Sequence, residues 1–345
     1  MAMNFAPGVF ADQLSELAGY KAGLALSIEE LCDHLSGDDR NLGDLVVQSE
    51  QHGIRIRSEE FEAVCYRLYY RIGYTEDEYD GCPSGIRLYH KYKSNPKMLA
   101  LYESVAKICN DMLTQMIVVD PKTIPKSGLD PTTIMIRCRQ EHGLQGMEMA
   151  LEYLMGFNQQ MRMSPHALHR FSEWHDPLEL KALFTGTSKA PEKGKFIDQR
   201  YVDYLSNNME RISAMHWRKF EELTAEFFNE SGFRVEIGPG SDDDGVDVRL
   251  WKADAKQDEK PTCLVQCKRQ KDKIEKIVIK GLAADVQFMG ADYGMIVTTS
   301  ELSPGAKTTI SSRGYPIEVV ERDAVKGWLT RLRTPGTGIV RNRPL

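Results

Sequence analysis

Three residues in the last third of the chain have the types and the spacing of a hydrolytic site. Asp247 begins an alternating apolar segment, and Gln266 and Lys268 end the next one, at residues 263–268. Alternate side chains of a strand share a face, so Gln266 and Lys268 should point the same way and Cys267 the other. Carboxylate and amide oxygens are ligands for a hard divalent cation, and a lysine can position or activate a water molecule. This set suits hydrolysis of a phosphodiester bond.

An aspartate followed by a Gln-x-Lys pair also arises by chance, with the aspartate capping a turn and the lysine solvated at a strand end. The placement of these residues favours a site. The acid and the lysine lie at strand ends, beside a glycine-rich turn, and they follow an amphipathic helix with Glu221 near its start. A lysine at the end of an apolar strand is costly to bury without a partner. We therefore interpret this group as a candidate active site.

The elements that must position these residues alternate between strands and helices. Their pattern predicts an α/β sandwich around a mixed central sheet, preceded by a mostly helical region, which is an α+β or α/β chain. The predicted strands lie at 233–237, 246–251, 263–268, 294–299 and 317–320, and the predicted helices at 216–231, 274–288, after Ser303-Pro304, and at 323–332.

The first two thirds of the chain have helical periodicity and no catalytic constellation. Ser27 and Ser58 each precede acidic residues in the pattern of a helix start, and further helices are predicted at 98–117, 131–143 and 146–157. The histidines of this part are dispersed and are expected at surface or capping positions. Breaker-rich segments lead us to predict four regions, namely a helical region 1–120, a helical middle region with a linker 121–205, a domain 206–334 that contains the candidate site, and a tail 335–345.

Five motifs in the C-terminal region resemble those of a known family. They are Phe220-Glu-Glu-Leu, Gly232-Phe-Arg-Val, Asp243-Asp-Gly-Val-Asp-Val, Val265-Gln-Cys-Lys-Arg and Gly294-Met-Ile-Val-Thr-Thr-Ser. Their order and spacing are similar to those of the catalytic domain of Mrr-like type IV restriction endonucleases, which belong to the PD-(D/E)XK superfamily. The resemblance covers residues 215–332 and implies a restriction-endonuclease-like fold for that part.

The resemblance also implies roles for individual residues. Asp247, Gln266, Lys268 and Glu221 match the catalytic positions, and Asp247, Glu221, Gln266 and the backbone carbonyl of Cys267 match the metal ligands. Asp243 matches a further, accessory acid. Gln266 departs from the glutamate of many superfamily members. Because an amide oxygen is a weaker ligand than a carboxylate, affinity for Mg²⁺ or Mn²⁺ should depend mainly on the two acids. Glu222 should point elsewhere on the helix.

Two further groups of polar residues follow the candidate strands. Arg269, Lys271, Lys273 and Lys276 come after Lys268 and could meet DNA phosphates, although a solvated helix face explains such a run equally well. Thr298-Thr299-Ser300 could cap the next helix or contact the DNA backbone, and capping is the favoured interpretation.

Composition excludes several classes of protein. The net charge is −6 and the acidic excess lies in the first 214 residues, so bulk positive charge does not hold this chain on DNA. Its seven cysteines form no Cys-x-x-Cys pair, which favours reduced thiols over a zinc site or disulfides. No apolar stretch approaches the roughly 20 residues that span a bilayer, and no secretory signal is present, so a cytoplasmic protein without membrane contacts is expected.

Together these observations predict a metal-dependent endonuclease that hydrolyses DNA, and the family resemblance suggests defence against foreign or modified DNA. The N-terminal region would recognise the target, sense an activating signal, bind a protein partner or build a homo-oligomer. Two alternatives stay open. One is a nucleic-acid-binding or scaffold protein whose nuclease fold no longer cuts, and the other is a DNA repair or junction nuclease.

Overall fold

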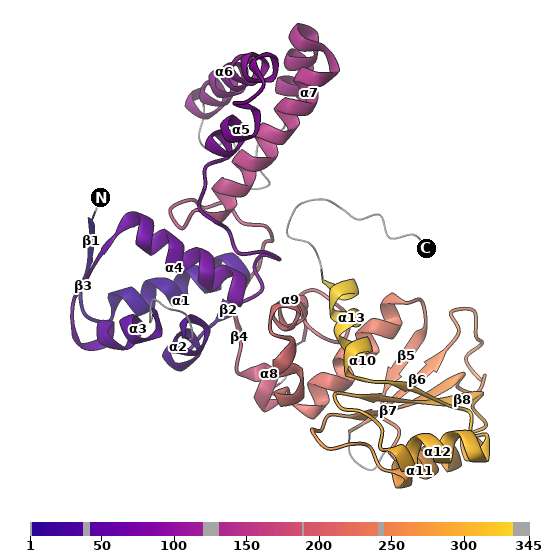
Figure 1. Ribbon diagram of the computed structural model, residues 1–345. Coiled ribbons are helices and arrows are strands. Elements are labelled where there is room, and N and C mark those ends of the chain that lie inside the picture. The colour runs from indigo at the N-terminus through magenta and orange to yellow at the C-terminus, as the bar shows by residue number, and fades with distance from the viewer. Residues whose placement is uncertain (1, 37–41, 120–130, 188–189, 241–244, 334–345) are drawn as a thin grey trace.

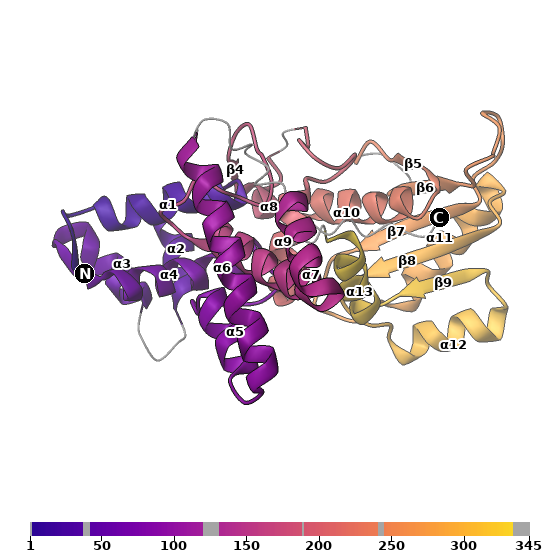
Figure 2. The same ribbon diagram turned by 90° about the horizontal axis from the view of Figure 1, so that it is seen from above.

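The computed structural model describes residues 2–36, 42–119, 131–187, 190–240 and 245–333, without the side chains of residues 116–119. The described chain has three parts, which are an N-terminal body, an arm of three helices and a C-terminal α/β part (Figures 1 and 2). The predicted tail, 335–345, lies outside the described residues.

The N-terminal body is helical, as predicted, with one small sheet. Ser27 caps its second helix in a capping box with Glu30, and Phe61 and Leu68 bury one face of its fourth helix. A two-stranded antiparallel pairing was not predicted, because each strand has only four residues and the two are some fifty residues apart. The elements are β1 (Ala2–Phe5), α1 (Val9–Ala22), β2 (Leu24–Ala25), α2 (Ile28–Leu35), α3 (Leu42–Gln51), β3 (Ile54–Arg57), which pairs with β1, and α4 (Ser58–Arg71).

The arm projects from the rest of the molecule (Figure 1). It consists of α5 (Ser84–Tyr92), α6 (Pro96–Val119) and α7 (Thr132–Met163), which pack around an apolar core of their own. The helices predicted at 98–117, 131–143 and 146–157 are confirmed in α6 and α7. At Gly143 the backbone leaves the helical region, with φ 67° and ψ −157°, at the point where the two predicted helices were separated. Helices on both sides of residue 120 therefore share one core.

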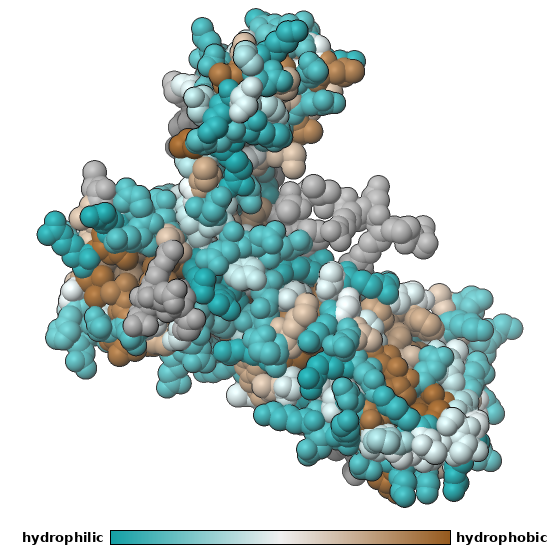
Figure 3. Space-filling view, viewed as in Figure 1, coloured by the Kyte–Doolittle hydropathy of each residue, from teal (hydrophilic) through white to brown (hydrophobic). Residues whose placement is uncertain are grey.

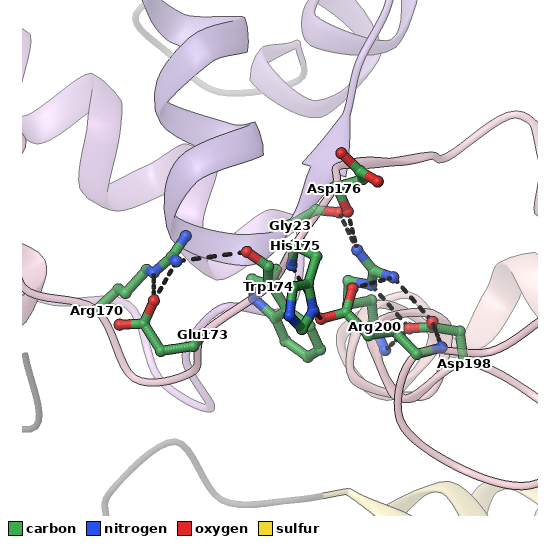
Figure 4. A network of polar contacts seen from close by, with 9 residues as sticks. Gly23, Arg170, Glu173, Trp174, His175, Asp176, Asp198 and Arg200 are labelled. Carbon is green, nitrogen blue, oxygen red and sulfur yellow. Dashed lines mark hydrogen bonds and ion pairs between the residues drawn. The ribbon is translucent and has the colours of Figure 1, made fainter.

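A connecting segment ties the arm and the body to the C-terminal part. It contains β4 (Leu178–Glu179), which pairs in parallel with β2, then α8 (Ala182–Thr185), α9 (Gln199–Asn207) and the 3-10 helix η1 (Met209–Ala214). Figure 4 shows the buried Arg200 at its centre. The guanidinium donates to Asp198 Oδ1 at 2.8 Å, to Gly23 O at 3.1 Å and to Asp176 O at 2.6 Å, and it lies 4.7 Å from the ring centre of Trp174. These bonds compensate the burial of the charge and fasten the segment to the end of α1.

The C-terminal part is a five-stranded mixed sheet with helices on both faces. The strand order is β5-β6-β7-β8-β9, antiparallel between the first three and parallel between the last three. This confirms the predicted α/β sandwich. The elements are α10 (Trp217–Glu230), β5 (Arg234–Ile237), β6 (Val248–Trp251), β7 (Cys263–Lys268), α11 (Lys276–Met289), β8 (Tyr293–Thr298), α12 (Pro304–Arg313), β9 (Ile317–Val320) and α13 (Arg322–Leu332).

Alternation along β7 divides the core of this part into two layers. Cys263 and Val265 face α10 and α13, and they belong to an apolar core that continues into the N-terminal body. Leu264 faces the opposite way, toward α11 and α12, where Ile279 and Leu282 are also buried. Because side chains of a strand alternate, the same rule sets the directions of the residues that follow at the end of β7.

Most of the surface in Figure 3 is hydrophilic, with apolar surface gathered on the N-terminal body and over the C-terminal part. In the described ranges, no helix combines the length and the apolar composition needed to cross a membrane.

Candidate active site

The end of β7 lies between β6 and β8 and gathers the residues singled out in the sequence. Asp247 stands one residue before β6, and its backbone amide donates to Val265 O at 3.0 Å. Its carboxylate Oδ2 accepts a hydrogen bond of 2.6 Å from the backbone amide of Cys267. The acid is thus held against β7 by two backbone contacts, one of them charge-assisted.

The thiol of Cys267 is buried and lies among charged groups. Its side chain packs toward α10, where Sγ lies 3.5 Å from Thr224 Oγ1. Burial raises the pKa of the thiol well above its ordinary value, the carboxylates of Asp247 and Glu221 raise it further, and Lys268 lowers it. The backbone amide of Cys267 contacts Asp247, and its side chain packs on α10 one turn after Glu221. The fold therefore brings elements that carry both acids to the end of β7, where Lys268 follows Cys267.

Glu221 is almost completely buried on α10, with 5% of the residue exposed. Its Oε2 accepts a 2.9 Å hydrogen bond from Arg218 Nη1, which also donates to Gly238 O at 2.8 Å. The neighbouring Glu222 points elsewhere, as expected, and forms a separate buried ion pair of 2.7 Å with Lys219. Sequence reasoning missed Arg218, although an Arg-x-x-Glu spacing on a helix was a signal for this pair.

Gln266 carries one of the eight buried side-chain N or O atoms that lack a hydrogen-bond partner in the described part of the chain. Its side-chain Oε1 has no hydrogen-bond partner among the described residues. The amide lies close to Gly245, where an added Cβ would stand 3.1 Å from Gln266 Nε2 and where φ is +82°. A buried polar atom without a partner is costly, and native structures contain few of them. Such an atom is suited to accept from, or to bind, something that the protein itself does not supply.

The donor set fits a hard divalent cation in its chemistry. Asp247, Glu221 and Gln266 provide two carboxylates and one amide oxygen, the ligand types that Mg²⁺ and Mn²⁺ prefer. Within the part of the chain that the structure describes, no group of three or more His, Cys, Asp or Glu side chains is arranged to hold a metal. The predicted accessory acid, Asp243, lies outside the described residues. A cation here would therefore depend on the amide and on backbone oxygens as well as the acids.

The three buried hydroxyls of the 298–300 segment donate hydrogen bonds to backbone carbonyls of Lys268 and of residues shortly after it. Thr298 Oγ1 donates to Lys268 O at 2.8 Å, Thr299 Oγ1 donates to Gln270 O at 3.1 Å, and Ser300 Oγ donates to Lys271 O at 3.1 Å. The favoured interpretation of this segment as a helix cap is wrong, because Ser303 caps α12 by accepting from Ala306 N at 3.2 Å. The hydroxyls of Thr298, Thr299 and Ser300, which we call the hydroxyl ladder, instead fix the backbone at the end of β7 and just after it.

The four basic residues predicted to contact DNA have different surroundings. Arg269 Nη1 donates to Ser213 O at 3.2 Å, so its guanidinium rests on η1. Lys273 lies 3.3 Å from Glu301 in an exposed ion pair. Lys271 and Lys276 are exposed. The three exposed lysines are therefore better placed to meet a phosphate than Arg269 is.

The expected role of one histidine is also corrected. His34 was expected at the surface or at a cap, but it is buried between α2 and α9, with its ring 5.5 Å from that of Tyr204. Burial, together with the smaller effect of the Arg211 charge, lowers its pKa to about 4. His34 is thus part of the junction between the body and the connecting segment.

Comparison with known proteins relates the C-terminal part of this chain to a family. Residues 212–329 match the family model Mrr_cat, described as a restriction endonuclease. A structure of the MspJI restriction endonuclease in complex with a 27-mer oligonucleotide is similar at 21% sequence identity and a TM-score of 0.29, over 43% of this chain. The aligned part amounts to 35% of that protein's length. No curated protein matches the chain. The family match spans α10 to β9 and most of α13, which include every described residue of the candidate site.

Proposed function

Since residues 212–329 form an Mrr-like restriction endonuclease domain, we propose that this chain is a metal-dependent endonuclease that hydrolyses phosphodiester bonds in DNA. The observation that carries the proposal is the buried Gln266 Oε1, which lacks a partner among the described residues. It stands two residues before Lys268 on the same strand and directly before Cys267, whose backbone amide binds Asp247. A cation bound by the two acids and by Gln266 would give this oxygen the partner that it lacks.

Asp247, Glu221, Gln266 and the backbone carbonyl of Cys267 would hold Mg²⁺ or Mn²⁺. Such a cation, when bound, polarises the phosphate and makes a water molecule more acidic. Asp247 is already oriented by the amide of Cys267, so little reorganisation is needed for it to act as a ligand. Lys268 shares a strand face with Gln266, where its ammonium can orient the attacking water and offset charge that develops on the phosphate.

Binding of DNA in this proposal is local. Lys271, Lys273 and Lys276, with Arg269 in a supporting place on η1, would follow the backbone next to the end of β7. Contacts with phosphates fix the register of the duplex without reading its sequence. The acidic excess of the first 214 residues would keep DNA away from the rest of the surface and limit binding to this region.

The biological role that we propose is defence against foreign or modified DNA in the cytoplasm. In this role the N-terminal body and the arm recognise the target, receive an activating signal through a protein partner, or pair two copies of the chain. The structural support is the separation of parts, because the arm has its own core while the body shares one with the nuclease domain.

A protein that binds nucleic acid on a nuclease fold without cutting is the second candidate. Two observations favour it. Arg218 already neutralises Glu221, and no group of three or more acidic, histidine or cysteine side chains in the described chain is arranged for a metal. A repair or junction nuclease is the third candidate, and it would use the same residues on branched DNA.

Cleavage of linear, supercoiled, methylated and branched DNA with Mg²⁺ or Mn²⁺ tests the proposal. Wild type should cut, whereas Asp247→Ala and Lys268→Ala should not. Asp254→Ala, an exposed acid in the β6–β7 loop, is the matched control and should cut like wild type. A preference for branched over linear duplex would support the junction nuclease. Absence of cutting together with DNA binding that is insensitive to Lys268→Ala would support the binding protein.

A further inference from the structure

Arg218 lies against the proposed cation site, and the mechanism above gives it no part. Its Nη1 donates both to Glu221 Oε2, at 2.9 Å, and to Gly238 O, at 2.8 Å. The acid belongs to the buried face of α10, whereas 30% of the Arg218 side chain is exposed. Gly238 N in turn donates to Asp247 O at 2.8 Å. One guanidinium therefore joins the carboxylate of Glu221 to the turn that leads to Asp247.

We propose that Arg218 is the resident counter-cation of Glu221, and that a divalent cation must displace its guanidinium from this carboxylate in order to bind. The inference rests on the proposed function, because it concerns the same cation site. A buried carboxylate is costly without a positive partner, and Arg218 meets that need in the cation-free protein. A guanidinium and a divalent cation at one carboxylate repel each other, so they compete.

The surroundings of Arg218 allow it to leave Glu221. Its second acceptor, Gly238 O, stays available, and the partly exposed side chain can be solvated once the carboxylate is taken. Displacement thus leaves no buried unpaired charge on the arginine. When no cation is bound, Arg218 neutralises the charge of Glu221. A cation therefore binds only at a concentration high enough to displace Arg218.

A purely structural role for Arg218 makes the opposite prediction. If the arginine only fastened the turn to α10, its removal would loosen the segment that carries Asp247 and weaken cation binding. If it competes, its removal strengthens cation binding. The sign of the change in affinity therefore separates the two roles.

The test is Mn²⁺ binding to the full chain by titration calorimetry, without DNA. Arg218→Gln should lower the Kd for Mn²⁺ by about tenfold, as expected from the loss of a unit charge a few ångströms from a partly screened cation. The matched control is Arg313→Gln, an exposed arginine of α12 whose guanidinium contacts Tyr315, and it should leave the Kd unchanged. Asp247→Ala supplies the baseline without a site. If circular dichroism shows that Arg218→Gln is unfolded, Arg218→Met, which keeps the aliphatic stem, replaces it in the same comparison.

Each result of this titration either supports or overturns the inference. Tighter binding by the Arg218 variant alone supports the inference. Equal or weaker binding by that variant, with clear binding by wild type, overturns the inference and leaves the proposed function in place. No binding by wild type or by the Arg218 variant beyond the Asp247→Ala baseline overturns both.

Discussion

Asp247 and Cys267 are joined by a hydrogen bond of 2.6 Å, in which the backbone amide of Cys267 donates to the carboxylate of Asp247. The acid is therefore fixed to the strand that carries Lys268, at the residue immediately before it. Because the donor is a backbone group, the contact does not depend on the cysteine side chain. It gives Asp247 two roles, as the end of a strand pairing and as the first proposed ligand of the cation.

These two roles separate in two substitutions of Asp247. Asp247→Asn keeps an acceptor for the Cys267 amide, so the free energy of unfolding should change little while Mn²⁺ binding is lost. Asp247→Ala removes the acceptor as well and should cost a further 1–3 kcal/mol or so, the usual cost of an unpaired buried donor. Urea unfolding and calorimetry on both variants measure this. Equal stability of the two variants would contradict the structural role.

Substitutions in the hydroxyl ladder should affect kcat and KM for DNA cleavage differently. Thr298 holds the carbonyl of Lys268, so Thr298→Val should lower kcat for DNA cleavage by about tenfold, because the lysine loses its position. Ser300 holds the carbonyl of Lys271, so Ser300→Ala should mainly raise KM. Thr298→Ser should recover kcat. Thr308→Val, an exposed residue of α12, is the control, and equal kinetics of all four variants would refute the positioning role.

Substitution of each of the two adjacent glutamates of α10 should affect stability and cation binding differently. Glu222→Gln leaves the buried Lys219 without its partner and should destabilise the protein by about 3–5 kcal/mol. Glu221→Gln leaves the partly exposed Arg218, which water can reach, and should cost much less stability while weakening Mn²⁺ binding. Thermal unfolding and calorimetry on the two variants compare these effects. A larger loss of stability from Glu221→Gln than from Glu222→Gln would contradict this assignment.

Acid should weaken the junction at His34. Burial lowers the pKa of His34 from 6.5 to about 4, so the unfolded chain binds more protons than the folded one between these values. The stability contributed by neutral His34 is therefore complete above pH 6.5 and is lost as the pH falls toward 4, by roughly 2 kcal/mol between pH 7.5 and 5.

Replacement of His34 by phenylalanine removes the titrating group and keeps an aromatic ring beside Tyr204. Urea unfolding of wild type and His34→Phe at pH 7.5 and 5 gives the measurement. The difference between the two pH values should be smaller in the variant by about the same amount. An unchanged difference would show that other groups cause the acid sensitivity.

Much of the C-terminal fold could be predicted because its strands are short, apolar and alternating. The predicted strand at 263–268 and the strand β7 have the same limits, and the directions of Gln266 and Cys267 followed from the period of two. The motif order then identified the domain. Local patterns were sufficient here because each element carries its own signal.

Features that depend on distant parts of the chain could not be predicted in this way. The pairing of Arg218 with Gly238 requires the turn after β5 to return to the first turn of α10. The hydroxyls of Thr298 and Ser300 bond to carbonyls some thirty residues away, so a local rule assigned them to a helix cap instead. The pairing of β1 with β3 joins strands of four residues each, which carry little pattern.

Phe5 at one end of the chain and Leu332 near the other belong to the same continuous apolar core, whereas the arm of α5–α7 has a core of its own. By thermodynamic linkage, a molecule that binds the folded N-terminal body also raises the free energy needed to open the catalytic sheet. The arm, by contrast, contributes Met163 at the end of α7 to this shared core, and the rest of its apolar residues pack in the separate core. In the role proposed above, the body is therefore the part through which a signal would act on the C-terminal domain, and most of the arm is the part that would change independently.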